Sequence, residues 1–159
     1  MDFVSRPAFE RLAPSPGLYA TMPIAEAFDW AALAEGIEAG EWYLVCFRSV
    51  RQPDADEQLL ETLDDAAHLE ASAAPGFVHY YKGATTEGGE CLSFCLWDSR
   101  AHARAASGRP AHALASAIVR EMYASYRLEF YRVFKAAAGG AFEFEPYDRP
   151  AQPDPHRLS

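Results

Sequence analysis

The sequence predicts a single α+β domain, and three observations carry this prediction. Aromatic and β-branched residues fill the runs 42–50 and 90–97, which is typical of buried strands. Residues 54–71 instead place apolar side chains at helical spacing. The chain has 159 residues, of which 50% are apolar or aromatic, so we expect one folded domain with extensions.

Composition also limits the partners and the compartment. The formal net charge is −9, whereas surfaces that bind nucleic acids are basic, so we expect neither a nucleic-acid partner nor binding to a membrane. The three cysteines lie in apolar runs, and an odd number does not fit a disulfide framework. We see neither a signal peptide nor an apolar stretch of roughly 20 residues, so the sequence predicts a cytoplasmic protein.

The predicted elements follow a β-α-β-β-α-β order. Residues 1–40 are rich in proline and predict an N-terminal arm with a short helix, and residues 148–159 predict a flexible tail. Between them, residues 41–147 predict the folded domain. Its strands are expected at 42–50, 77–82, 90–97 and 141–145, and its helices at 54–71, 98–106 and 110–138. This order is the split βαβ pattern of ferredoxin-like domains, an antiparallel sheet with its helices on one face.

The strands are apolar on both of their faces, which predicts a second covering layer. One face of the strand 42–50 carries Trp42 and Leu44, and the other carries Tyr43 and Val45. The helices can cover only one face of the sheet, and a large exposed apolar face is typical of an interface. We expect a second copy of the chain to cover the other face in a homodimer, with the N-terminal arm as the alternative cover.

Residues 41–147 resemble the dimeric α+β barrel superfamily, and most nearly its antibiotic-biosynthesis-monooxygenase-like branch. The resemblance lies in the element order, in the helix exit Ala-Ala-Pro-Gly-Phe at 73–77, and in the segment Leu-Trp-Asp-Ser-Arg-Ala-His-Ala-Arg-Ala-Ala at 96–106. It implies a small-molecule enzyme for cofactor-independent oxygenation, cyclisation or isomerisation of an aromatic or polyketide-like substrate. The alternatives are a haem-binding protein of the same fold and a non-catalytic dimeric ligand-binding protein.

Two histidines are candidate catalytic residues. His79 lies mid-strand, on the face that alternation assigns to Phe77 and Tyr81, where it could act as a base or ligate a metal. Alternatively, it is an edge-strand histidine that reaches water. His112 lies in the first turn of the helix 110–138, where it could join Arg109 in holding an anion, or simply begin a surface helix.

The helix predicted over 110–138 supplies a third catalytic candidate, Tyr126. It falls within the buried stripe of that helix, on the side of Tyr123 and Glu129, so it is a core residue, a contact for a phenolic substrate or an acid. Glu129 could act as an inward base, or pair on the surface with Arg127 or Arg132.

Five residues are candidates for binding a substrate. They are Arg48, Tyr81, Trp97, Arg109 and Glu129. Aromatic rings could hold a flat ligand, and Arg48 could pair with a carboxylate or enolate. Core packing for Trp97 and a simple salt bridge for Arg48 are the competing interpretations.

The sequence predicts no metal site. The five histidines, at positions 68, 79, 102, 112 and 156, show no spacing typical of metal ligands. No cofactor is expected, and the alternative is haem with His79 or His112 as its axial ligand.

Overall fold

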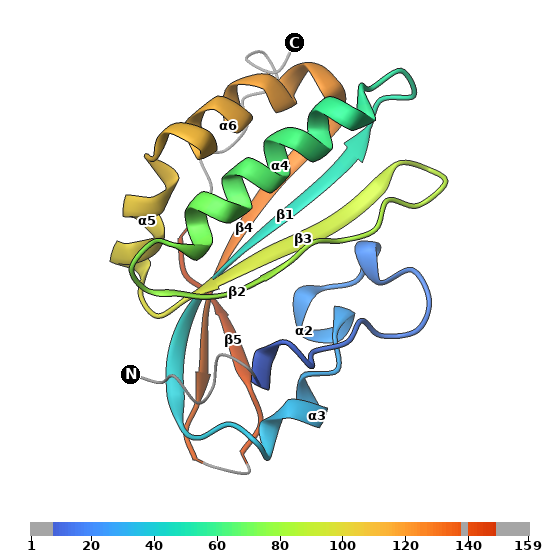
Figure 1. Ribbon diagram of the computed structural model, residues 1–159. Coiled ribbons are helices and arrows are strands. Elements are labelled where there is room, and N and C mark those ends of the chain that lie inside the picture. Colours follow the sequence, from blue (N-terminus) through green and yellow to red (C-terminus); the bar gives the residue numbers. More distant parts are fainter. Residues whose placement is uncertain (1–7, 138–139, 149–159) are drawn as a thin grey trace.

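The computed structural model describes residues 8–137 and 140–148, and its centre is a five-stranded antiparallel sheet (Figure 1). The strands are β1 (Gly40–Arg51), β2 (Phe77–Tyr81), β3 (Glu90–Trp97), β4 (Tyr123–Lys135) and β5 (Glu143–Pro146), in the spatial order β2-β3-β1-β4-β5. The helices are α2 (Ile24–Ala27), α3 (Trp30–Ala34), α4 (Glu57–Ser72), α5 (Arg100–Ser107) and α6 (Pro110–Met122), with a 3-10 turn η1 (Tyr19–Thr21). The predicted α+β class and the ferredoxin-like order are confirmed.

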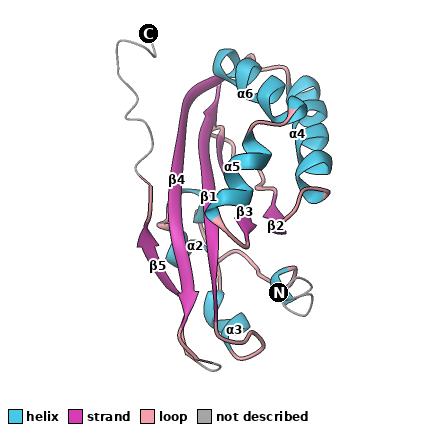
Figure 2. Ribbon diagram, turned by 90° about the vertical axis from the view of Figure 1, so that its left-hand side faces the viewer, coloured by secondary structure: helices cyan, strands magenta, loops and turns pink. Residues whose placement is uncertain are grey.

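The predicted helix over 110–138 is wrong in its second half. The chain leaves α6 at Met122 and continues as β4, which pairs with β1 along the length of both strands (Figure 2). An apolar spacing of four residues, such as Tyr126 and Phe130, fits one face of a strand as well as one face of a helix. Pairing with β1 decides the outcome, because it satisfies the backbone of a segment that is rich in aromatic residues.

β4 is therefore the fourth strand of the ferredoxin-like order, and the strand expected at 141–145 is an addition to it. This short segment forms β5 at the edge of the sheet, where Phe144 lies opposite Val133. A further difference concerns the start of the helix expected at 54–71: α4 begins at Glu57, and Asp56 caps it by accepting a hydrogen bond from the backbone N–H of Leu59 at 3.0 Å.

The N-terminal arm covers the face of the sheet that we expected a second copy to cover. Phe9, Phe28 and Ile37 of this arm are almost completely enclosed against side chains of β1 and β3. The strand residues beneath them, Leu44 and Phe94, have no solvent-exposed surface. The alternative cover is thus the one that the structure shows, and this face gives no argument for a homodimer.

Specific polar contacts fix the arm in place. The Arg48 guanidinium donates to the backbone carbonyl of Ala20 at 3.0 Å, and the Tyr19 hydroxyl lies 3.2 Å from that of Tyr81. Asp29 accepts from the N–H of Ala32 at 3.2 Å and so caps α3, which lies in the arm where the sequence predicts a short helix. Among the residues described, no helix has the length and apolarity needed to cross a membrane.

Candidate functional site

A cavity of about 610 Å³ lies between the sheet and the helices α4, α5 and α6. It exists because α4 and α6 pack chiefly against each other, while α6 meets the sheet near its junction with β4 (Figure 2). Seven aromatic side chains of the sheet border the cavity: Tyr43, Phe47, Tyr80, Trp97, Tyr123, Tyr126 and Phe130. A volume of this size is within the range of small-molecule sites.

The middle of the cavity is apolar. Phe47, Leu128 and Phe130 pack against a buried cluster that includes residues of α5, but they are only half-buried because they also border the cavity. The Phe130 ring stacks on Tyr43 with their centroids 6.1 Å apart, while Trp97 is enclosed and donates its indole N–H to the Cys95 sulfur at 3.1 Å. Such a surface suits a flat apolar ligand.

Three polar side chains that are hydrogen-bonded to one another close one end of the cavity. The Arg100 guanidinium donates to both oxygens of Asp148, at 3.0 and 2.7 Å, and the Tyr43 hydroxyl donates to the same carboxylate. Burial and the neighbouring carboxylate raise the pKa of Tyr43, whereas the hydrogen bond from Arg100 lowers the pKa of Asp148. The polar groups of these three side chains are thus already hydrogen-bonded to one another.

The opposite end collects further polar side chains, from α4 and three strands. The Tyr80 hydroxyl donates to the Oδ1 atom of Asp64 at 2.8 Å, and burial together with this carboxylate raises the pKa of Tyr80. The rings of Tyr123 and Tyr126 stack with centroids 5.6 Å apart, and Lys82 also borders this end. Burial raises the pKa of both stacked tyrosines, so their hydroxyls stay protonated near neutral pH.

His112 borders the cavity, but the carboxylate of Glu70 occupies the anion site that the sequence predicts beside it. The carboxylate of Glu70 accepts from the backbone N–H groups of Ala111 and His112, each at 3.1 Å, and so caps α6. Arg109 precedes the helix and does not line the cavity. Burial lowers the pKa of His112, against an opposing effect of Glu70, so the imidazole is neutral near pH 7.

Of the sequence candidates, Trp97, His112 and Tyr126 meet at this cavity, while four others lie on the arm side of the sheet. His79 lies there because a β-bulge between Phe77 and His79 shifts the register, so these two residues do not share a face as predicted. The His79 ring packs 5.9 Å from Phe94, and burial lowers its pKa.

The remaining arm-side candidates make structural contacts. Arg48 pairs with Glu129 at 2.9 Å, and Glu129 also accepts from Arg127 and Tyr131. Because Glu129 lies on a strand, it faces away from Tyr126, contrary to the predicted shared helix side. Tyr81 completes the group, stacked on Phe94 at 5.9 Å.

Sequence reasoning missed Asp64, Tyr80 and the closing group of Tyr43, Arg100 and Asp148. Alternation along β2 was the available signal for Tyr80, because adjacent residues of a strand face opposite ways. No local signal marks Asp148, which reaches the cavity only through the path of the chain after β5. Within the described ranges, no group of three or more His, Cys, Asp or Glu side chains could hold a metal ion.

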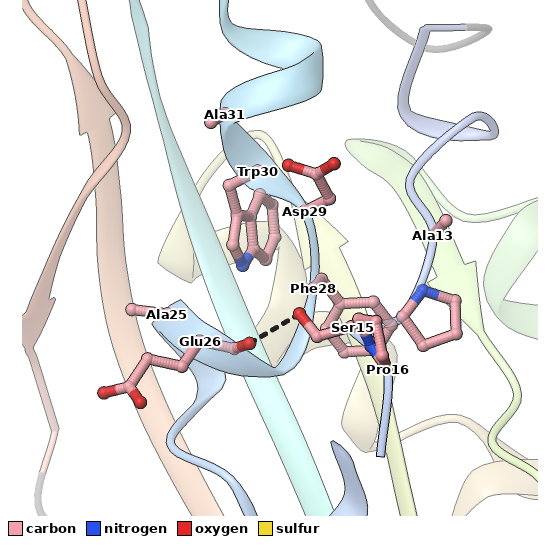
Figure 3. Close-up of a pocket in the computed structure, with 10 residues that line it drawn as sticks. Ala13, Ser15, Pro16, Ala25, Glu26, Phe28, Asp29, Trp30 and Ala31 are labelled. Atoms are coloured by element: carbon pink, nitrogen blue, oxygen red, sulfur yellow. Dashed lines mark hydrogen bonds between the residues drawn. The ribbon is translucent and has the colours of Figure 1, made fainter. Parts of the chain in front are cut away.

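A second hollow, of about 430 Å³, lies within the N-terminal arm (Figure 3). Its polar groups serve the arm itself: the Ser15 hydroxyl donates to the Glu26 carbonyl at 2.7 Å, and Asp29 caps α3. The Trp30 indole donates to the Ile24 carbonyl at 3.0 Å. This hollow offers no convergent polar groups, and the helix-side cavity is the stronger candidate site.

Solved structures share this fold. The protein Rv0793 of Mycobacterium tuberculosis matches with a TM-score of 0.52 and 22% identity, over 69% of this chain and 99% of that protein. A candidate antibiotic biosynthesis monooxygenase from Nitrosomonas europaea matches with a TM-score of 0.51 and 11% identity, over 70% and 94% of the two chains. The protein is therefore a ferredoxin-like α+β protein with the fold of the antibiotic-biosynthesis-monooxygenase-like group, as the sequence resemblance implied.

Within that class, the chain belongs to the PB2B2.08-like family, whose model matches residues 3–146. A curated relative, the UPF0643 protein PB2B2.08 of Schizosaccharomyces pombe, is 29% identical in an alignment 144 residues long, and the match covers 80% of this chain. The chain spans 66% of that relative's length. The match to the family model includes the arm residues from 3 onward and ends just before Asp148.

Proposed function

We propose that the protein is a small-molecule enzyme that holds an aromatic or polyketide-like substrate in the helix-side cavity. One observation carries this proposal: an aromatic-lined cavity of about 610 Å³ with polar groups at both ends. The reaction is oxygenation, cyclisation or isomerisation, which are the reactions implied by the resemblance. A scaffold protein without a ligand would gain nothing from leaving the rings of Phe47 and Phe130 partly open, because burial of apolar surface stabilises a fold.

All three reactions can begin with removal of a proton from a phenol or an enol. His112 suits this step, because its neutral imidazole borders the cavity and can accept the proton. The Tyr126 hydroxyl, which stays protonated, is the matching acid. In an oxygenation, dioxygen is the co-substrate: a methylene carbon becomes a carbonyl, one oxygen atom enters the product and the other leaves as water.

Haem is the alternative cofactor. His79 lies against Phe94 beneath the arm, whereas His112 borders a cavity, so His112 is the histidine that would hold a bound haem. Haem would supply one-electron and oxygen chemistry at this position. An absorbance spectrum of the purified protein tests this, and a Soret band that persists in His112→Ala would exclude His112 as the ligand.

The homodimer and the cytoplasmic location stay predictions. Because the arm covers the inner face of the sheet, a second copy would have to contact another surface, such as the edge of β4 before Tyr131, where its pairing with β5 begins. The native mass of the full chain decides between one copy and two.

A pair of matched variants tests the proposed function. Ala115 lines the cavity, and Ala113 on the same helix is exposed and does not line it. We expect Ala115→Phe to fill the cavity and abolish binding of aromatic ligands, measured by calorimetry, and Ala113→Phe to bind as the wild type does. Oxygen uptake and product mass then separate an enzyme from a non-catalytic ligand-binding protein. Equal binding by both variants would contradict the proposal.

A further inference from the structure

The two ends of the cavity differ in how well their polar groups are paired. At the end of Tyr43, Arg100 and Asp148, hydrogen bonds join all three side chains. At the other end, two buried side-chain atoms of the described residues lack a hydrogen-bond partner: Nε of Arg51 and Oδ2 of Asp64. Both side chains border the cavity. Buried polar atoms in folded proteins are nearly always paired, so this pair calls for an explanation.

Only one of the two carboxylate oxygens of Asp64 accepts a hydrogen bond. Its Oδ1 atom accepts from Tyr80 at 2.8 Å, which fixes the carboxylate beside the cavity. The Lys82 ammonium lies 3.7 Å from Oδ2, too far for a hydrogen bond, and is shared with Glu61 and Asp65 at 3.6 and 3.4 Å. Oδ2 is therefore an acceptor that a ligand's hydroxyl group can satisfy.

Arg51 is the complementary case, because it has an N–H donor without an acceptor. Its Nη1 atom donates to the exposed Glu57 at 2.6 Å, while Nε donates to no described residue. The guanidinium lies beside Tyr123, where it opposes the effect of burial on the pKa of that hydroxyl. A ligand's carbonyl oxygen is the neutral group that an arginine N–H best recognises here, since the neighbouring Asp64 disfavours an anion.

We infer that this end of the cavity is a recognition subsite for a hydroxylated aromatic ketone, whose hydroxyl donates to Asp64 and whose carbonyl accepts from Arg51. Both atoms are shielded in the unliganded structure, so the subsite requires these two side chains, which are 19% and 36% exposed, to rotate toward the ligand on binding. The inference rests on the proposed function and specifies the substrate class of that same cavity.

Calorimetry with a matched ligand series tests the subsite. The probes are 6-hydroxy-1-tetralone, its methyl ether and 1-tetralone, each titrated into the full-length wild type. We expect the hydroxy ketone to bind about tenfold more tightly than the other two, which is typical of one hydrogen bond to a charged group. Asp64→Asn should remove this preference. Asp65→Asn is the control, because Asp65 contacts the same Lys82 but does not line the cavity.

A second pair of variants tests the carbonyl contact and guards against misfolding. Arg51→Gln removes the Nε donor, whereas Glu57→Gln removes only its exposed partner. We expect the first to weaken binding of all three ketones and the second to leave binding unchanged, with thermal unfolding confirming that each variant folds. Equal binding of the three probes to the wild type overturns the subsite and leaves the cavity function standing. Failure of every probe to bind overturns both.

Discussion

The two faces of the sheet carry similar apolar residues, but one face is fully covered and the other borders a cavity. On the arm side, Leu44, Leu92 and Phe94 are completely enclosed by the N-terminal arm. On the helix side, Phe47 and Phe130 stay half-open above a cavity. Both faces are apolar in sequence, so composition alone does not distinguish a core from a site. What distinguishes them is how closely the covering layer approaches the sheet.

This difference assigns separate roles to the candidate residues. On the arm side, charged and aromatic groups such as Arg48 and Tyr81 bond to the arm or to one another. On the helix side, His112 and Tyr126 border open space. The closed face therefore stabilises the fold, and under the proposed function the open face carries the chemistry. Variants on the two faces should then differ in their effects.

Removal of an aromatic ring should cost most on the closed face. Phe28 is 3% exposed and packs against Trp30, Tyr81 and Phe94, so we expect Phe28→Ala to lower the free energy of unfolding by about 3–5 kcal/mol. Phe130→Ala should cost clearly less, since its ring already borders a cavity. Chemical denaturation measures both. Equal losses would mean that the helix side is as tightly packed as the arm side.

On the open face, loss of His112 should affect turnover rather than folding. If His112 is the base, His112→Gln should reduce the turnover of an aromatic substrate by about 10²-fold or more. Burial lowers the pKa of His112 below 6.5, so the wild-type rate should stay level from pH 8 to about 6.5 and fall only as the imidazole becomes protonated. His79→Gln is the control on the other face, and a matching loss there would contradict the assignment.

The ion pair on the closed face should appear as a dependence of stability on pH. Burial opposes ionisation of Glu129, but Arg48, Tyr131 and Arg127 outweigh it and lower the pKa of Glu129 below 4.5. A carboxyl with a lowered pKa stabilises the fold above its unfolded pKa, and this contribution disappears as the pH falls through the lowered value.

We therefore expect Glu129→Gln to cost about 1–3 kcal/mol at pH 7, and less with each step below pH 4.5. Urea titrations at several pH values measure this difference between variant and wild type. Glu35→Gln, at an exposed position of the arm, should show no such trend. A constant cost across the whole range would argue against the ion pair.

The smallest effects compare two tyrosine hydroxyls of the cavity. Tyr43 donates to Asp148, so Tyr43→Phe should cost about 1 kcal/mol of stability. Among the described residues, the Tyr126 hydroxyl has no hydrogen-bond partner, so Tyr126→Phe should leave the melting temperature almost unchanged and weaken ligand binding or turnover. A large fall in the stability of Tyr126→Phe would make this hydroxyl structural.

The sequence was sufficient for the fold class because its strand and helix patterns are strong. The runs 42–50 and 90–97 became β1 and β3, and the stripe of 54–71 became α4. The prediction of a helix over 110–138 was wrong in its second half, because the spacing of Tyr126 and Phe130 fits a strand as well as a helix. Only the pairing of this segment with β1 decides between the two.

The site was only partly predictable, because it depends on contacts between distant segments. Trp97, His112 and Tyr126 reached the cavity, although Tyr126 was assigned to the wrong type of element. His79 changed faces through a single β-bulge, which alternation alone does not reveal. The contact between Arg100 and Asp148 joins residues 48 positions apart, and no local pattern marks it.

The most direct test of the contrast between the faces is fluorine NMR of protein labelled with 3-fluorotyrosine. Of the eight tyrosines of the chain, seven divide between the two sides, and the eighth, Tyr147, packs beside Tyr43 without lining the cavity. Tyr43, Tyr80, Tyr123 and Tyr126 line the cavity, whereas Tyr19, Tyr81 and Tyr131 pack on the arm side. Single Tyr→Phe variants assign each resonance. On addition of an aromatic ketone that binds, the account predicts shifts for the first group and none for the second. Shifts confined to the arm-side tyrosines would contradict it.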